Sequence, residues 1–317
     1  MATGLGIDVG SEWVKVVQVE VSGMSVTVTG ALKLPRAAPA GPSDEEGAAT
    51  HAIPPNLGEE LRRAGLRRAG VMGLTGKEIL LRYLSTPPMP PEKLKMFIDM
   101  QLSGRMAAGR REEEAAPAVT YDFRILNVPT GLRGDLVIMT GSAKNEFLFG
   151  LFAAAKAAGV HAKRAVPAAF GLAQAYLRTQ KIPAGETVVV LDVGHEVLEV
   201  AILQEESLYF ARSGPGGGRR FDQALTKLLG LPPERLKDFK HQRARVLPEG
   251  AKTSSPQEQQ FQNAFREPAE IIANTVRAAV TFCRTQAKMP KLDYQRILLS
   301  GGGGTYRYVF PTTESSV

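Results

Sequence analysis

Two short segments of the sequence share an Asp-Val-Gly pattern, and each opens one half of the chain. They read LGIDVGSEWVKVVQVE over residues 5–20 and VVVLDVGHEVLEVAILQ over residues 188–204. In both, a run of β-branched and aliphatic residues precedes Asp-Val-Gly, and a second such run follows after a short turn. Glycine allows the tight chain reversal that a hairpin needs. The pattern therefore predicts two similar β-hairpins and indicates an internal duplication at the scale of domains.

The segments that follow the first hairpin alternate between strand and helix patterns. Residues 36–56 are rich in proline, alanine and charge, which predicts a loop without fixed structure. A proline cluster leads into an amphipathic helix near 92–102, and Ser142 is in place to cap a helix over 144–158. The other predictions here are a helix over 57–69 and strands over 25–34, 70–74, 120–128 and 135–143.

The residue pattern predicts a helix over 166–179, a junction between the two halves of the chain over 181–186 and, beyond the second hairpin, a strand over 208–212. A glycine loop over 214–218 precedes a helix over 219–229, and a polar, helix-compatible segment covers 236–262. The next helix, from 268 to about 287, has four apolar residues on one face: Ile272, Val276, Val280 and Cys283. A strand over 296–299 then runs into Ser300 and four glycines.

Composition places the chain among soluble globular proteins. With 317 residues, 44% hydrophobic and 22% charged, it can fill the cores of two domains. No apolar run approaches the ~20 residues of a membrane-spanning helix, and no basic region followed by an apolar core opens the chain. The single cysteine, Cys283, fits a reducing compartment. We therefore expect a cytoplasmic protein.

The formal net charge of +7 comes with several basic clusters. They lie at 62–63, 67–68, 110–111 and 237–245, none is interleaved with aromatic residues, and acidic residues follow several of them. We interpret them as solvated helix faces, with attraction to the anionic inner membrane surface as the alternative. No specific nucleic-acid partner is expected.

The Asp-Val-Gly turns are also suited to chemistry. Glycine brings backbone N–H groups close to an anion, and the aspartate can position a magnesium ion through its waters. One such turn is weak evidence, because Asp-Gly turns often serve only to close hairpins. Two turns at corresponding places, followed by a strand and Ser-Gly-Gly-Gly, are far more specific. This order resembles the actin, sugar-kinase and heat-shock ATPase superfamily.

The resemblance implies a role for nine residues as nucleotide-binding positions. Asp8, Gly10 and Ser11 would form the first phosphate loop, and Lys15 would reach the terminal phosphates. Asp192 and Gly194 would form the second loop across an interdomain cleft, and both aspartates would hold magnesium through water. The adenosine loop would consist of Gly301, Gly302 and Gly303.

Within the superfamily, the middle of the chain resembles the PilM family of type IV pilus and secretion assembly proteins. DVGSEWVK matches the family's DIGSSSVK type of first loop. STPPMPPEKLKMFI, TYDFRIL, DLVIMTGSAKNEFLFGLFAAAKAAGV and RAVPAAFGLAQAY follow its inserted subdomain, and LYFARSGPGGGRRFDQAL echoes a strand–Pro-x-Gly-Gly–helix element. The resemblance covers residues 5 to about 304 and is weakest over 35–68 and 231–262.

That family implies an α/β, actin-like fold of two ribonuclease-H-like domains, with mixed sheets flanked by helices. Residues 1–184 would form the first domain, with an inserted α+β subdomain over about 81–160, and 185–317 the second, C-terminally truncated. ATP and Mg²⁺ are the implied cofactors. The implied partner is the N-terminal cytoplasmic segment of a PilN-like inner-membrane protein, which would recruit the chain to the inner face of the membrane; self-association stays open.

Some residues depart from the family pattern. His195 and Glu196 replace small or hydroxyl residues in the second loop, and Glu12 and Trp13 replace small residues in the first. A carboxylate aimed at a triphosphate would be repelled, so hydrolysis is in doubt and the chain is at most a weak ATPase. Trp13 is expected to be a packing residue. TYRYVFPTTESSV cannot supply the family's last elements, so one side of the nucleotide pocket is expected to be open.

Three rival functions remain on the same scaffold. A pseudo-ATPase would keep the fold and the partner groove, and His195 and Glu196 favour it. An FtsA-like division protein would be favoured by an amphipathic C-terminal helix, which TYRYVFPTTESSV does not form. A small-molecule kinase needs an aspartate base, and none is evident. No P-loop motif, nucleophile elbow or histidine ligand spacing supports other chemistry.

Overall fold

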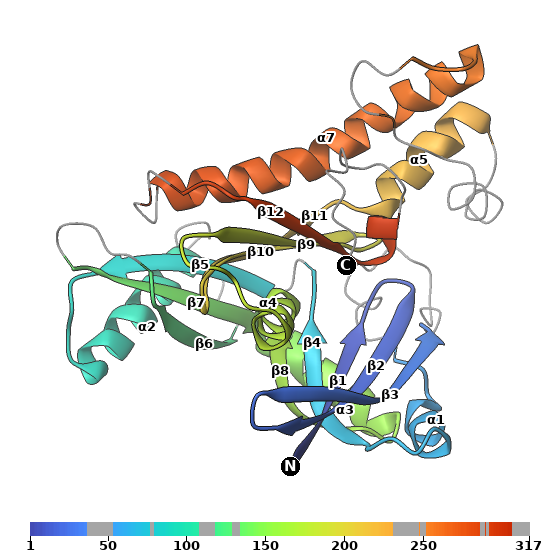
Figure 1. Cartoon of the computed structure of the whole chain (residues 1–317). Helices are drawn as coiled ribbons and strands as arrows, with labels where there is room; N and C mark the ends of the chain where they lie inside the picture. The colour runs from blue at the N-terminus through green and yellow to red at the C-terminus, as the bar shows by residue number, and fades with distance from the viewer. Residues whose placement is uncertain are drawn as a thin grey trace.

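The computed structural model describes residues 1–36, 53–76, 79–107, 118–128, 134–230, 247, 252–285, 289 and 292–305. Most of the predicted loop over 36–56, much of the polar segment over 236–262 and residues 306–317 lie outside this part of the chain. Figure 1 shows three sheets, two of which carry the Asp-Val-Gly hairpins.

The first sheet has the strand order β3-β2-β1-β4-β8. β1 (Ala2–Val9), β2 (Trp13–Ser22) and β3 (Ser25–Pro35) form an antiparallel meander. β4 (Ala69–Leu74) pairs parallel with β1, and β8 (His161–Pro167) pairs parallel with β4. The alternating residues Leu5, Ile7, Val14 and Val16 point to one face. α1 (Leu57–Arg63) and α3 (Asn145–Ala157) cover that face.

An inserted antiparallel sheet has the order β5-β7-β6. Its elements are β5 (Ile79–Thr86), α2 (Pro91–Ala107), β6 (Val119–Leu126) and β7 (Leu136–Lys144). On one face, Ile138 of β7 packs against Leu94 and Ile98 of α2. On the other face, Met139 belongs to the same buried cluster as the core of the second half. The inserted sheet therefore joins two cores.

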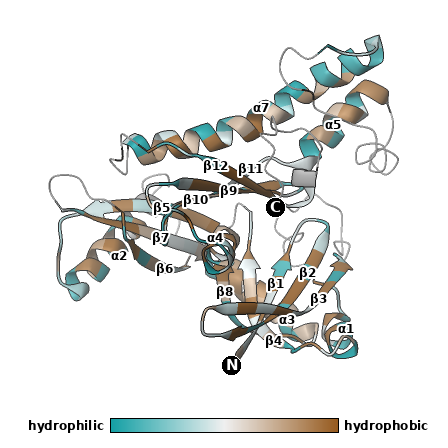
Figure 2. Cartoon of the chain, viewed as in Figure 1, coloured by the Kyte–Doolittle hydropathy of each residue, from teal (hydrophilic) through white to brown (hydrophobic). Residues whose placement is uncertain are grey.

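The sheet of the second half has the order β11-β10-β9-β12. β9 (Thr187–Val193), β10 (Val197–Gln204) and β11 (Ser207–Pro215) form a meander, and β12 (Arg296–Ser300) pairs parallel with β9. α4 (Ala168–Thr179) lies on one face, and α5 (Gly218–Leu229) and α7 (Pro256–Thr285) lie on the other (Figure 1). Because both faces are covered, β9 and β10 are almost wholly hydrophobic (Figure 2). All four predicted apolar-face residues of α7 are buried.

The two halves repeat the same plan, as the paired hairpins predicted. In each, a three-stranded meander is followed by a strand that pairs parallel with its first strand. Gly10 N–H donates to Trp13 O, and Gly194 N–H donates to Val197 O, both at 3.0 Å. The two Asp-Val-Gly turns are therefore closed by equivalent backbone hydrogen bonds.

Several local predictions were wrong. Residues 161–167 form β8 rather than opening a helix at 166, because a parallel neighbour, β4, was available to pair with them. Ser142 caps no helix, since it lies within β7 and its hydroxyl donates to Leu80 O. The helix predicted from 268 begins at Pro256, and Pro268 is buried inside it. Burial of Phe265 against α5 supports the turns that precede this proline.

Among the described residues, no helix is long and apolar enough to span a membrane.

Candidate functional site

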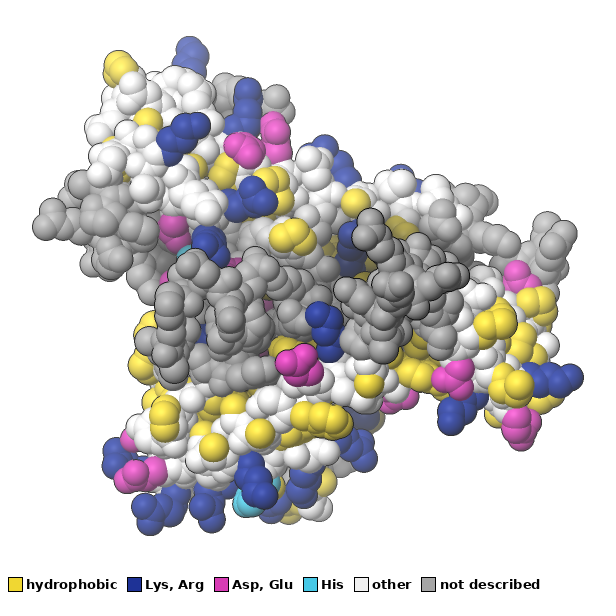
Figure 3. Space-filling view, turned by 180° about the vertical axis from the view of Figure 1, so that it is seen from behind, with side chains coloured by type: hydrophobic (Ala, Val, Ile, Leu, Met, Phe, Trp, Pro, Cys, Tyr) yellow, Lys and Arg dark blue, Asp and Glu magenta, His cyan; other side chains and the backbone are white. Residues whose placement is uncertain are grey.

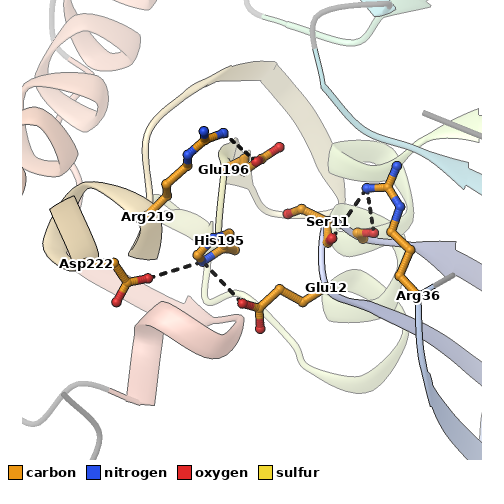
Figure 4. Close-up of polar contacts among 8 residues, drawn as sticks. Ser11, Glu12, Arg36, His195, Glu196, Arg219 and Asp222 are labelled. Atoms are coloured by element: carbon orange, nitrogen blue, oxygen red, sulfur yellow. Dashed lines mark hydrogen bonds and ion pairs between the residues drawn. The ribbon is translucent and has the colours of Figure 1, made fainter. Parts of the chain in front are cut away.

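The two Asp-Val-Gly turns lie next to each other between the two large sheets (Figure 4). Nδ1 of His195 in the second turn is 3.8 Å from Oε1 of Glu12 in the first. The charges of Asp192 and Asp8 both raise the pKa of the same buried carboxyl group, that of Glu199. The structure therefore brings the two predicted aspartates, which are 184 positions apart (192 − 8), to one place.

The first turn is built around Gly10. A Cβ atom on Gly10 would meet Trp13 O at 3.1 Å, so the tight reversal leaves little room for a side chain. Asp8 is the last residue of β1 but one and pairs in register with Lys15 of β2. The Lys15 ammonium lies 3.0 Å from Oδ2 of Asp8, so Lys15 is held at the base of the turn. Lys33 lies over the Trp13 ring at 4.2 Å, which supports the predicted packing role of Trp13.

Arg36 is a part of this turn that the sequence did not predict. Its guanidinium donates to Gly10 O and Ser11 O, both at 3.4 Å, and its backbone N–H donates to Glu12 O at 2.9 Å. Burial lowers the pKa of Arg36, and the charge of Glu196 in the second turn opposes that shift. Arg36 thus ties the end of β3 to the first turn and faces the second.

The second turn is joined to the start of α5. Gly218 N–H donates to Gly194 O at 2.9 Å, so the helix N-terminus is anchored on the turn. Gly217 precedes the helix with a φ of 99°, and a Cβ atom there would lie 2.3 Å from Gly194 O. Only glycine fits this position, which explains the glycine loop in the sequence.

Polar side chains form three contacts around the second turn (Figure 4). Nδ1 of His195 lies 3.7 Å from Oδ2 of Asp222 in α5 and 3.8 Å from Glu12. Glu196 accepts a hydrogen bond from Arg219 at 2.7 Å. The sequence raised the concern that the Glu196 carboxylate would face a phosphate, and the contact with Arg219 offsets part of the negative charge of this carboxylate. Nothing in the sequence pattern pointed to Asp222 or Arg219.

The end of β12 meets β9 beside the second aspartate. Ser300 donates a hydrogen bond to Oδ1 of Asp192 at 2.6 Å. Cβ atoms on Gly301 and Gly303 would come within 2.5 and 2.9 Å of a β9 carbonyl oxygen. A Cβ atom on Gly302 would meet nothing within 4 Å. Gly301 and Gly303 therefore let the chain pack closely against β9, while a side chain at position 302 would point into open space.

Glu199 is the deeply buried acid of the site. It pairs in register with Asp192, its side chain is 2% exposed, and Ser213 donates to its Oε2 at 2.5 Å. Its Oε1 has no hydrogen-bond partner among the described residues. The pKa of Glu199 is raised to about 8, mainly by burial and to a smaller extent by the charges of Asp192 and Asp8, while the hydrogen bond from the Ser213 hydroxyl opposes the shift.

The oxygen donors at the strand ends suit a hard cation rather than a transition metal. Among the described residues, no three His, Cys, Asp or Glu side chains form a metal-ligand cluster. The chain can thus offer Asp8 and Asp192, and a cation held there would need further ligands from water or from a bound anion. The backbone of the two glycine turns would lie near such an anion, with the side chains of Glu12 and His195 between the turns.

Comparison with known proteins gives one family match. The family model described as type IV pilus assembly protein PilM matches residues 6–309. No curated protein sequence matches significantly.

Solved structures are similar over nearly the whole chain. A PilM-PilN type IV pilus biogenesis complex matches with a TM-score of 0.71 and 20% identity, over 96% of this chain and 83% of that one. This similarity confirms the predicted actin-like α/β fold. More distant are MreB5 of Spiroplasma citri bound to ADP, with a TM-score of 0.48, 13% identity and coverage of 97% and 87%. EutJ of Carboxydothermus hydrogenoformans matches with a TM-score of 0.46 and 11% identity, over 98% of this chain and 88% of that one.

Proposed function

The chain belongs to the PilM family of type IV pilus assembly proteins, and we propose that it is a nucleotide-responsive platform in a pilus or secretion machine. In this proposal, residues 1–184 and 185–317 act as two actin-like domains around one nucleotide. The inserted subdomain, about 81–160, lies beside the surface that accepts a partner. Nucleotide binding would bias how the two domains close.

The observation that carries the nucleotide assignment is the pair of equivalent glycine turns that face one another. Each is closed by the same backbone hydrogen bond, and each follows a strand whose last residue but one is an aspartate. Gly10 and Gly194 use their own N–H groups to close the turns, so they would bring the turns close to the phosphates, and Ser11 would offer its backbone N–H. Asp8 and Asp192 would hold the waters of Mg²⁺, and Gly302 lies on the open side of the glycine run, where adenosine would approach.

Lys15 fits a phosphate role without a change of the fold. Its ammonium group is half exposed and is held by Asp8 rather than by a buried partner. An incoming phosphate would compete with Asp8 for Lys15 and so release this carboxylate toward a cation. Mg²⁺ and phosphate binding are thus expected to support each other.

A second candidate is a pseudo-ATPase scaffold that keeps the fold and does not bind ATP. The number of carboxylates around the turns favours it, since Glu12, Glu196 and Asp222 lie there in addition to the two aspartates. The contact with Arg219 offsets part of this negative charge. Direct measurement of ATP binding separates the two candidates.

Thermal unfolding with and without MgATP tests the nucleotide site. Ligand that binds only the folded state raises its stability, by ~2.7 kcal/mol at a concentration of 100 Kd. We expect MgATP to raise the Tm of the wild type by several degrees and to leave the Tm of Asp8→Ala and Asp192→Ala unchanged. Asp122→Ala is the matched control, because Asp122 is an exposed carboxylate on β6. No MgATP effect on the wild type would leave the scaffold role.

The proposed partner is the N-terminal cytoplasmic segment of a PilN-like inner-membrane protein, and the similarity of the fold to a PilM-PilN complex supports a PilN-like partner. Its binding would place this chain at the inner face of the membrane. Isothermal titration with a synthetic peptide of that segment, from the PilN-like protein of the same genome, should show saturable binding. A scrambled peptide of the same composition is the control. Equal heats from the two peptides would contradict this partner.

A further inference from the structure

One edge of the first sheet is rich in cations. We call it the basic edge; its members are Arg62, Arg67, Arg68, Lys156, Lys163 and Arg164, and all six are exposed. Figure 3 shows Lys and Arg side chains gathered along this lower border of the molecule. No described carboxylate forms an ion pair with any of them within 4.0 Å. The edge therefore carries a local excess of positive charge.

The fold creates this edge by starting parallel strands together. β1, β4 and β8 run parallel, so their first residues meet at one end of the sheet and their last residues at the other. His161 N–H donates to Arg68 O at 2.7 Å, which fixes the segment before β4 against β8. Gly58 N–H donates to Ala158 O at 2.8 Å, which holds α1 beside the end of α3. The basic edge is thus a built surface, opposite to the end at which Asp8 lies.

The two glutamates of α1 form ion pairs with a neighbouring arginine. Arg63 lies 3.2 Å from Glu59 and 3.0 Å from Glu60, so these two carboxylates are paired with a cation outside the basic edge. This local pairing leaves the arginines of the loop between α1 and β4 facing solvent. The positive charges of these arginines can therefore attract an anionic partner.

Two methionines extend from the same end of the sheet. Met24 is 77% exposed at the tip of the β2–β3 hairpin, where Gly23 has a φ of 59°, and Met1 is fully exposed before β1. β2 ends and β3 begins beside the start of β1, because Ala2 pairs with Val21. Across five strands spaced ~4.8 Å apart, the edge is roughly 19 Å wide. Cations flanked by protruding apolar side chains fit a surface with charged headgroups over an apolar interior.

We propose that the basic edge binds an anionic phospholipid surface directly, in addition to any membrane protein that recruits the chain. Phosphate headgroups would contact the arginines and lysines, and Met1 and Met24 would enter the interface between them. A nucleic acid fits less well, because no Phe, Tyr or Trp is among the residues that form the edge and could stack on bases. In this orientation, the paired glycine turns face away from the bilayer.

Flotation of the full-length chain with lipid vesicles tests the proposal. We expect binding to vesicles that contain phosphatidylglycerol, little binding to pure phosphatidylcholine, and a steep decrease between 50 and 300 mM salt. Each basic residue at an anionic surface contributes roughly fivefold to partitioning, so Arg67→Glu/Arg68→Glu should lower it at least ~25-fold. Met24→Ser should lower it severalfold without changing the salt dependence.

The matched control is Arg266→Glu/Arg277→Glu, which makes the same change in net charge on exposed positions of α7, far from the edge (Figure 1). It should bind within about twofold of the wild type, because these charges lie beyond a Debye length from the lipid. Far-ultraviolet circular dichroism should show that both double variants are folded. Equal losses in the two double variants would overturn the proposal, as would the absence of binding to phosphatidylglycerol. DNA binding that is tighter than vesicle binding and equally dependent on Arg67 and Arg68 would reassign the edge to nucleic acid.

Discussion

Glu199 is a carboxyl group that folding removes almost completely from water. Its pKa rises from 4.5 to about 8, mainly because burial penalises the charged form. The folded state therefore binds this proton more tightly than the unfolded state. Its contribution to stability is fully present below pH 4.5, decreases as the pH rises toward 8 and is lost above that value.

The variant Glu199→Gln should remove this pH dependence, because the amide resembles the protonated acid and cannot ionise. Each pKa unit corresponds to ~1.4 kcal/mol, so the shift is worth on the order of a few kcal/mol. Urea unfolding at pH 6 and pH 9 should show a smaller fall in the free energy of unfolding for the variant than for the wild type. Glu206→Gln, at an exposed glutamate, is the control. Parallel pH curves for wild type and Glu199→Gln would contradict the assignment.

Single residues also show what sequence reasoning can reach. Asp8 and Asp192 could be proposed as site residues because each stands at a fixed place in a repeated local pattern. Arg36, Arg219 and Asp222 were not found, because their contacts join segments that no local pattern links. A side chain whose role comes from a distant segment leaves no periodic signal in its own neighbourhood.

At the scale of elements, the glycine run after β12 is a close packing device. Gly301 has a φ of 85°, and a Cβ atom there would lie 2.5 Å from Val193 O and 2.8 Å from Oδ1 of Asp192. Gly302 has open space in the corresponding direction. The two neighbouring glycines therefore differ in what they tolerate.

We expect Gly301→Ala to destabilise the chain and Gly302→Ala to be nearly neutral. The first change combines an unfavourable positive φ with a backbone clash, which together cost roughly 2–4 kcal/mol. The second should stay within about 0.5 kcal/mol. Urea unfolding of the two variants at one pH checks this pair. Similar stabilities for both variants would show that the run is a flexible linker rather than a packed turn.

Elements were predicted best where two signals agreed. The hairpins had both β-branched runs and a turn glycine, and they formed as expected. β5 was missed, and the last two residues of β8 were assigned to the helix that follows, because short runs such as 161–167 mix charge, alanine and proline. Those runs became strands because β4 and β7 supplied partners. Pairing with a distant strand outweighed weak local propensity.

At the scale of the whole molecule, the inserted sheet lies between two hydrophobic cores and contributes one face to each. Adjacent residues of β7 point to opposite faces: Ile138 packs against α2, and Met139 joins the cluster of β9, β10 and β11. Tyr83 of β5 extends this contact, since its hydroxyl donates to Ala211 O at 3.2 Å and its ring stacks on Phe210 at 5.2 Å. The insertion is thus a structural part of the second half as well.

Substitution of Ile138 and of Met139 should perturb the two cores independently. Ile138→Ala and Met139→Ala each remove a fully buried side chain, at a cost of ~2–5 kcal/mol. In native-state hydrogen exchange, Met139→Ala should raise exchange in β10 and β11, and Ile138→Ala should raise it in α2. Each variant serves as the control for the other. If both changed the same segments, the two faces of β7 would not belong to separate cores.

The sequence by itself determined the repeated hairpins, the apolar face of α7 and the family to which the chain belongs, because these depend on residues that are close in the chain or follow a fixed order. Tertiary structure alone decided which side chains surround the paired turns, that Gly301 and Gly303 press on β9, and that the insertion packs against the second half. The physical reason is that burial and electrostatic fields depend on distances in space, and the chain brings residues 12 and 195 together only when both sheets have formed.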